Sequence, residues 1–142
     1  MALRFDVGPF EKLHIGKTVL CNSHQRASFM FEGEVPILRG NSVLQLQVAS
    51  NSVEKLYCCV QKIYLEQAFA ENQGSYLALM VQALKEEPSR YSELKEVDAF
   101  VHGGDHYKAL KRLKKLVSPT AFADQTEPQN YVRRQWNDRQ GA

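Results

Sequence analysis

The apolar residues of this 142-residue chain change their spacing near residue 50, and this change constrains the fold more than any other feature. Before it, apolar and polar residues alternate in short runs, as expected for strands with one buried face. After it, apolar residues recur every three or four positions, as expected for amphipathic helices. The sequence therefore predicts an α+β fold, with a small antiparallel β-sheet followed by an α-helical half of about four helices.

Five short runs in the first part predict the strands. They are separated by glycine, proline and asparagine residues, which favour tight turns because they tolerate or preset the required φ angles. The expected strands cover residues 3–7, 12–15, 18–21, 27–31 and 35–38.

Capping residues and apolar stripes predict the helices. Asn51 can cap the first helix, with Glu54 bonding back to the cap. Asp105 can cap the last helix, which is expected to run over residues 106–117. Between them, a second helix is expected to end before Pro88 and a third to stop at Gly103. The apolar residues that mark the second helix are Leu77, Met80, Val81 and Leu84.

The predicted organisation has three parts. Residues 1–45 form a β module, residues 46–118 form the helical region, and residues 119–142 form a polar, flexible tail. As an alternative for the tail, Tyr131, Val132, Gln135 and Trp136 share a spacing with which a short helix could form on contact with a partner.

Positive charge is concentrated in the last predicted helix. The net charge of the chain is only +2, which alone does not predict a polyanionic partner. Four cations nevertheless fall on one face of the last helix: Lys108, Lys111, Arg112 and Lys115. Such a face can neutralise several phosphates of a nucleic acid, and the alternative is a merely solvated surface.

A second set of cations lies in the predicted sheet. These are Arg4, Lys12, Arg26 and Arg39, with Phe29 and Phe31 close in sequence. Cations interleaved with aromatic rings can hold single-stranded bases, although in so small a sheet the rings can equally form the core.

The sequence offers no pattern typical of an enzyme. It lacks a phosphate-binding loop and a dinucleotide fingerprint, so we expect no cofactor. His102 and His106 flank two glycines, which favours a turn over a metal site. Cys21, Cys58 and Cys59 fit no disulfide or zinc spacing and are expected to be reduced thiols. Without an apolar run of membrane-spanning length or a secretion signal, we expect a cytoplasmic location.

Several segments together resemble the FlbT family, which is known for flagellum biosynthesis repressors. They lie in order over roughly residues 1–117 and read PILR (36–39), ASNSVEKLY (49–57), VQKIYL (60–65) and GDHYKAL (104–110). The resemblance implies a cytoplasmic regulator that associates with the 5′ untranslated region of flagellin mRNA and lowers its translation or lifetime. It also implies work alongside a small helical companion, FlaF, and leaves the direction of regulation open.

Residues 3–39 are similar, over a shorter stretch, to the carbon storage regulator family of RNA-binding proteins. That similarity implies a homodimer or higher oligomer in which Leu3, Arg4 and Arg39 contact RNA. It would also explain how a small sheet gains area, by pairing strands between two chains.

An adaptor that binds flagellin or FlaF is the competing hypothesis. It would act through the apolar stripe of the first helix and affect flagellin mRNA only indirectly. The stripe consists of Val53, Leu56, Tyr57, Val60 and Tyr64, and its alternative role is simple packing against the sheet.

Overall fold

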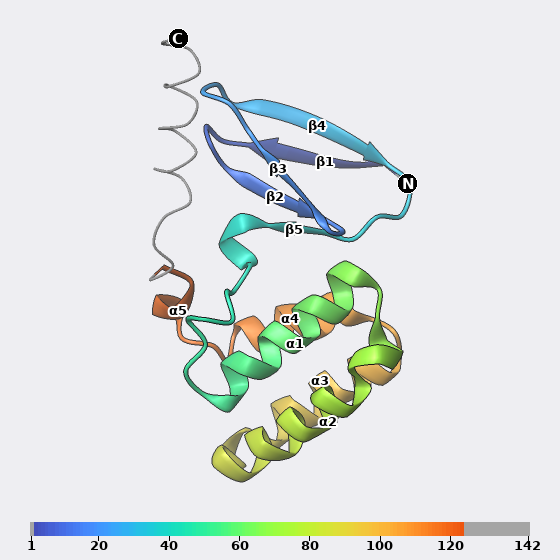
Figure 1. Cartoon of the computed structure of the whole chain (residues 1–142), viewed down its shortest axis with the longest axis vertical. Coiled ribbons are helices and arrows are strands. Elements are labelled where there is room, and N and C mark those ends of the chain that lie inside the picture. Colours follow the sequence, from blue (N-terminus) through green and yellow to red (C-terminus); the bar gives the residue numbers. More distant parts are fainter. Residues whose placement is uncertain (1, 124–142) are drawn as a thin grey trace. The chain divides into compact units, whose positions relative to one another are not determined.

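A computed structural model describes residues 2–123 of the chain (Figure 1). The described residues fall into two compact units, which are treated separately below. Unit 1 contains residues 2–40 and all the strands, and unit 2 contains residues 41–123 and the α-helices. None of the helices in the described part combines the length and hydropathy needed to cross a bilayer.

Unit 1 has five strands close to their predicted positions, but they form two antiparallel sheets instead of one. The strands are β1 (Ala2–Val7), β2 (Lys12–Ile15), β3 (Thr18–Cys21), β4 (Ala27–Glu32) and β5 (Ile37–Arg39). β1 pairs with β4, and a three-stranded sheet has the order β3-β2-β5. Both sheets contribute to one apolar cluster, in which Val7, Leu13 and Ile37 are buried beside the half-buried Phe5, Phe29 and Phe31.

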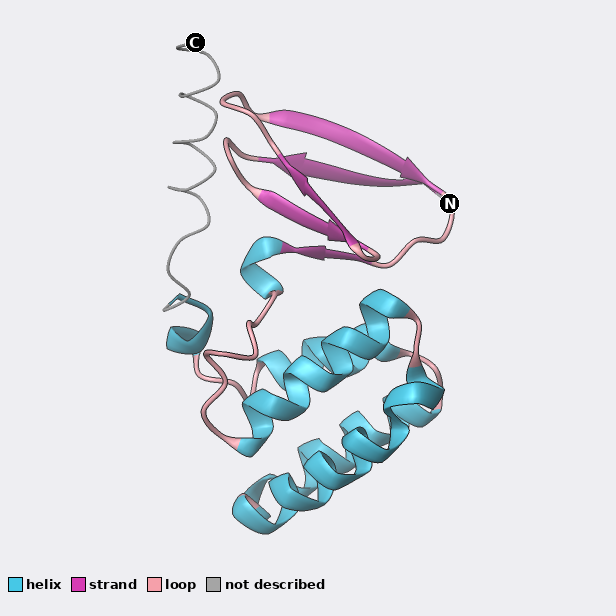
Figure 2. Cartoon of the chain, in the orientation of Figure 1, coloured by secondary structure: helices cyan, strands magenta, loops and turns pink. Residues whose placement is uncertain are grey.

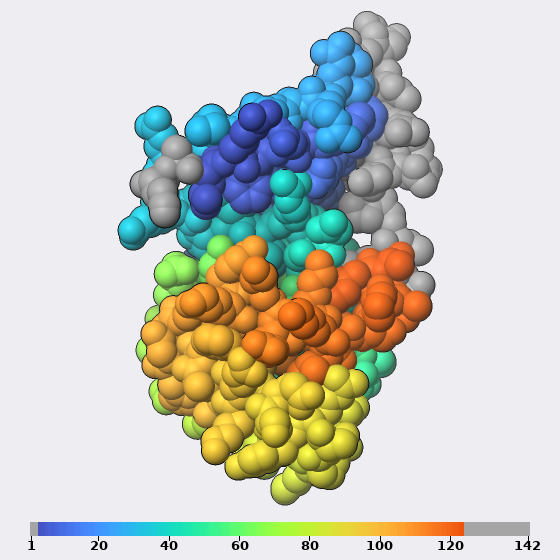
Figure 3. All heavy atoms as spheres, turned by 180° about the vertical axis from the view of Figure 1, so that it is seen from behind, coloured from blue at the N-terminus to red at the C-terminus, as the bar shows by residue number. Residues whose placement is uncertain are grey.

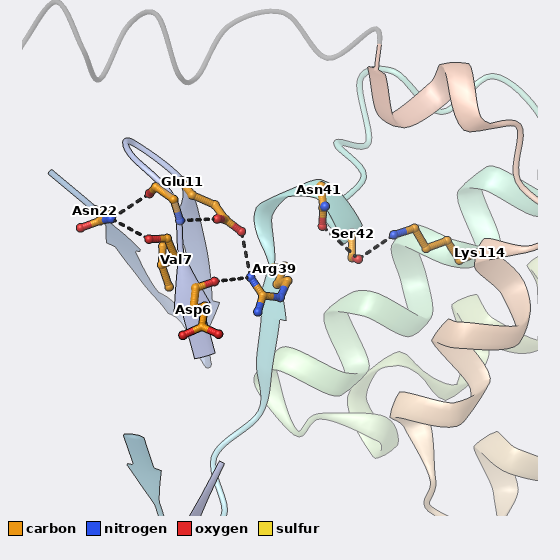
Figure 4. Close-up of polar contacts among 9 residues, drawn as sticks. Asp6, Val7, Glu11, Asn22, Arg39, Asn41, Ser42 and Lys114 are labelled. Carbon is orange, nitrogen blue, oxygen red and sulfur yellow. Dashed lines mark hydrogen bonds and ion pairs between the residues drawn. The ribbon is translucent and has the colours of Figure 1, made fainter. Parts of the chain in front are cut away.

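The side chain of Asn22 holds the segment that leads from β3 to β4, the point at which the chain passes from one sheet to the other. The two hydrogens of its buried amide group are shared among the carbonyl oxygens of Val7, Gly8 and Gln25, at N···O distances of 3.1, 2.7 and 2.8 Å (Figure 4 draws the first). Its amide oxygen accepts from the backbone N–H of Ser23 at 2.8 Å. Asn22 therefore holds the segment between the two sheets, a role beyond that of the turn residue expected from sequence.

Unit 2 is built around its first helix (Figure 2). α1 packs against both α2 and α4, and α3 packs against α4. The helices are α1 (Ser52–Glu66), α2 (Phe69–Glu86), α3 (Tyr91–His102), α4 (His106–Lys114) and α5 (Pro119–Ala123), with short 3-10 turns η1 (Gly40–Ser42) and η2 (Pro88–Arg90).

The predicted cap of α1 is confirmed. Asn51 Oδ1 accepts a hydrogen bond from the backbone N–H of Glu54 at 2.8 Å. The carboxylate of Glu54, which was expected to bond back to Asn51, accepts instead from the hydroxyl of Ser50, the residue before the cap, at 3.1 Å.

The helix marked by Leu77, Met80, Val81 and Leu84 is confirmed as α2, but only part of this apolar stripe faces inward. Tyr76, Met80 and Ala83 are buried, whereas Leu77 and Val81 are 45% and 49% exposed. α2 carries apolar residues on two faces, and the face that includes the ring of Tyr76 is the one packed inward. The other face is left on the surface of unit 2.

The C-terminal end of the described chain is more ordered than expected. α4 ends at Lys114, before the predicted residue 117, and residues 119–123, which we assigned to the tail, form α5 with Ala121 buried. The short helix suggested for Tyr131–Trp136 lies outside the described residues.

The Asn22 contacts predict a measurable loss of stability. Asn22→Ala leaves three carbonyl groups without their donor, and we expect unit 1 to lose about 3 kcal/mol. Hydrogen exchange of the β1 and β4 amides measures this loss. Asn41→Ala, at an exposed position, is the control and should leave the exchange unchanged. Equal exchange in the two variants would contradict the assigned role of Asn22.

Candidate nucleic-acid interface

The basic helix α4 turns its lysines outward because its other face is part of the core. Ala109, Leu110 and Leu113 are buried, which fixes the rotation of the helix. Lys108 and Lys111 are exposed on the opposite side, as is Lys115 directly after the helix, and we call these three residues the α4 stripe. Figure 3 shows α4 (orange) at the surface of unit 2 beside α3 (yellow to gold). The predicted cap is also present, since Asp105 accepts from the backbone N–H of Lys108 at 3.2 Å.

Two of the four predicted cations of α4 are held in exposed ion pairs. Lys108 Nζ lies 3.5 Å from Asp105 Oδ2, and Arg112 Nη2 lies 2.6 Å from Glu96 Oε1 on α3. Exposed pairs of this kind contribute about 1 kcal/mol or less. A phosphate group could therefore replace the carboxylate at Lys108 at little cost, while the half-buried Arg112 mainly ties α4 to α3.

An exposed tyrosine, missed in the sequence, borders the α4 stripe. Tyr107 is 45% exposed, and the Nζ atom of Lys111 lies 5.7 Å from the centre of its ring. Its ring also lies 5.8 Å from that of Tyr64 on α1. The helical spacing of Tyr107 and Lys111 is a signal that could have revealed this neighbour. Together they combine a cation with an aromatic face, as surfaces that hold single-stranded bases do.

Lys114, by contrast, points away from the stripe. Its Nζ atom donates to Ser42 Oγ at 2.8 Å (Figure 4) and lies 5.3 Å from the ring centre of Phe122 on α5. Lys114 therefore links α4 to η1 and α5 and is not part of the interface.

Two of the four predicted cations of unit 1, Arg39 and Arg4, are engaged within that unit. Arg39 Nη1 lies 3.0 Å from Glu11 Oε1 and donates to the backbone oxygen of Asp6 (Figure 4). The guanidinium of Arg39 also lies over the ring of Phe5 at 5.1 Å. Arg4 pairs with Asp6 at 3.3 Å. Hydrogen bonding from Ser28 and the charge of Arg4 lower the pKa of Asp6, which keeps this acid ionised among the arginines.

The remaining unit 1 residues give a weaker case for base stacking. Lys12 is half-buried and Arg26 is exposed. Phe29 and Phe31 belong to the apolar cluster, and Phe31 makes an edge-on contact with Phe5 at 5.6 Å. Phe29 and Phe31 therefore contribute to the core of unit 1, which was the alternative to base stacking in the sequence analysis.

The apolar stripe of α1 is not an open groove. Val53, Leu56, Tyr57 and Val60 are at most 4% exposed, and only Tyr64 is half-exposed. The expected partner surface is therefore largely core. Its packing partners within unit 2 include the helices α2 and α4, and Phe122 lies edge-on to Tyr57 at 5.3 Å.

A cluster of ionisable and aromatic residues joins α2 and α3. Tyr76 Oη donates to Asp98 Oδ1 at 2.6 Å, and His102 Nδ1 lies 3.2 Å from the same oxygen. Burial and the Asp98 contact raise the pKa of Tyr76, so its hydroxyl stays protonated and serves as a donor. Within residues 2–123, no group of three histidine, cysteine or acidic side chains could hold a metal ion.

Comparison with known proteins places the chain in a family. Its residues 3–120 match the family model described as "Flagellar protein FlbT", a match that spans both units. The chain belongs to the FlbT family. No solved structure matches it.

Named relatives occur in several bacteria. A probable flagellum biosynthesis repressor protein FlbT of Rhodopseudomonas palustris is 33% identical over 117 residues, covering 82% of this chain and 93% of the relative. A relative of the same printed description from Bradyrhizobium diazoefficiens is 31% identical, covering 83% of this chain and 82% of its own length. One from a Caulobacter species is 26% identical, covering 82% and 92%.

The cysteines of α1 are predicted to react slowly with thiol reagents. Burial, together with the charge of Glu54, raises the pKa of Cys58 to about 11, and burial raises that of Cys59. At pH 8 only about one Cys58 in a thousand is thiolate, and this fraction grows about tenfold per pH unit up to the pKa. Rate measurements with a chromogenic disulfide reagent should give one fast thiol, the exposed Cys21, and two slow ones. Cys21→Ser should remove the fast phase, and three equally fast thiols would contradict the burial of Cys58 and Cys59.

Proposed function

We propose that this protein is a cytoplasmic regulator that represses flagellum synthesis after transcription, by binding the 5′ untranslated region of flagellin mRNA. The relatives' printed names, flagellum biosynthesis repressor, support the process in which it acts. The resemblance described above suggests mRNA as the target. The α4 stripe is the surface that we assign to RNA contact.

One observation carries this assignment: three exposed lysines and an exposed tyrosine lie along one side of α4 while the other side is buried. The buried side keeps the helix from rotating, so the lysines keep a fixed spacing and can contact successive phosphates. Lysine supplies charge without base specificity. The ring of Tyr107 adds a stacking surface, and for this reason we expect a single-stranded segment of the leader to bind.

Unit 1 has a supporting part in this proposal. Arg26 and Lys12 remain as additional cations, whereas Arg4 and Arg39 must first exchange an intramolecular partner for RNA. We therefore expect substitutions in unit 1 to reduce RNA affinity less than substitutions in the α4 stripe.

The adaptor hypothesis is the second candidate, with FlaF or flagellin as the ligand. Its expected surface on α1 is buried, so a partner would have to displace α2 or α4 to reach Val53, Leu56 and Val60. We rank it below RNA binding for this reason.

Charge reversal on the α4 stripe tests the proposal. Lys108→Glu, Lys111→Glu and Lys115→Glu in one variant remove about three phosphate contacts. The slope of log affinity for a flagellin leader RNA against log salt should therefore fall by about 2, and the affinity at low salt by at least about tenfold. Fluorescence anisotropy with nuclease-treated protein measures both quantities.

A matched control separates a local contact from general electrostatics. Lys17→Glu, Lys55→Glu and Lys95→Glu change the net charge equally at exposed positions outside the stripe. The control should keep most of the affinity and its salt slope. Equal losses in the two variants, or no binding by the native protein at low salt, would overturn the proposal.

A further inference from the structure

The outer face of α2 is apolar and unpartnered within the described residues. Leu77 and Val81 are 45% and 49% exposed, and they lie one helical turn apart. Beside them runs a second row of exposed positions with small side chains: Ala70, Gly74 and Ala78. Side chains spaced by four residues form ridges and grooves on a helix. α2 therefore presents one apolar ridge next to one shallow groove.

We propose that this face binds the same face of a second copy of the chain, with the two α2 helices antiparallel. In a two-fold symmetric contact, the ridge of each copy must fit the groove of the other. Two antiparallel registers, one helical turn apart, satisfy this condition, and we assign the one that also brings opposite charges together. This register places Leu77 against Ala78 of the second copy and Val81 against Gly74 of the second copy. A Cβ atom added at Gly74 meets no atom within 4 Å in the chain itself, so the space over this glycine is open to a partner's side chain.

Charge complementarity supports the same partner and selects this register. Glu71 lies near the start of α2 and Lys85 near its end, both exposed on or beside the apolar face. Among residues 2–123 neither makes an ion pair. In the assigned register, Lys85 of each copy reaches the turn that holds Glu71 of the other. Two equal pairs thus close the two ends of the contact, which a parallel arrangement would not allow.

The length of α2 limits the strength of this contact. Its 18 residues span about 27 Å, and a single pair of such helices buries an area at the low end of specific interfaces. We therefore expect a dimer that dissociates in the micromolar range.

Charge exchange provides the sharpest test, with sedimentation velocity of the full-length chain over a concentration series as the measurement. Glu71→Lys alone, or Lys85→Glu alone, replaces each of the two symmetry-related ion pairs with a pair of like charges. Each should raise the dissociation constant about fivefold, and the double variant should restore it. Leu77→Lys combined with Val81→Lys should leave only monomer.

Gly74→Leu separates a loss of contact from a loss of folding. Leucine favours helix over glycine by close to 1 kcal/mol at an exposed site, so the variant should unfold at a higher temperature while dimerising more weakly. A native chain that stays monomeric at every concentration would overturn the proposal. So would a dimer that the Leu77 and Val81 substitutions leave intact, because another surface would then form it.

Discussion

The burial of one face of α1 determines how unit 2 presents its surface. α1 packs against α2 on one side and α4 on another, and its Leu56, Val60 and Ile63 are fully buried. Burying each such side chain contributes about 1.5–3 kcal/mol, more than an exposed ion pair supplies. The rotation of α2 and α4 therefore follows from apolar packing. The lysines of α4 and the second apolar face of α2 are exposed as a consequence, and both proposals above depend on this arrangement.

In unit 1, polar contacts hold the strands and loops in place. Glu11 accepts from the backbone N–H of Gly8 at 2.7 Å and pairs with Arg39, so it joins the loop after β1 to the end of β5 (Figure 4). Asn22 holds the same loop from the other direction. A unit of some forty residues has a small apolar core, and such contacts supply order that the core alone cannot. Arg39 was selected from the sequence as a candidate RNA contact, but these contacts give it a structural role in unit 1.

The sequence predicted those features that depend on local periodicity and capping. The strands of unit 1, the cap at Asn51, the cap at Asp105 and the family were predictable because each has a short-range signal. The inward face of α2 was not, since Leu77 and Tyr76 offer two competing stripes and only tertiary packing selects between them. The ion pairs of Arg39 and Arg112 join residues 28 and 16 positions apart, and no local pattern reveals such pairs. For the same reason, a set of cations chosen by helical spacing included Arg112. Tyr107 was missed for a different reason, because only cations were considered on this helix.

Photocrosslinking is the most direct test of contact between α4 and RNA. A flagellin leader RNA with photoreactive uridines is irradiated with the native protein, and the crosslinked peptide is identified by mass spectrometry. We expect a crosslink at Tyr107 or elsewhere in the peptide that contains the α4 stripe. Crosslinks confined to residues 2–40, or none at a protein concentration that retains the RNA, would contradict contact between α4 and RNA.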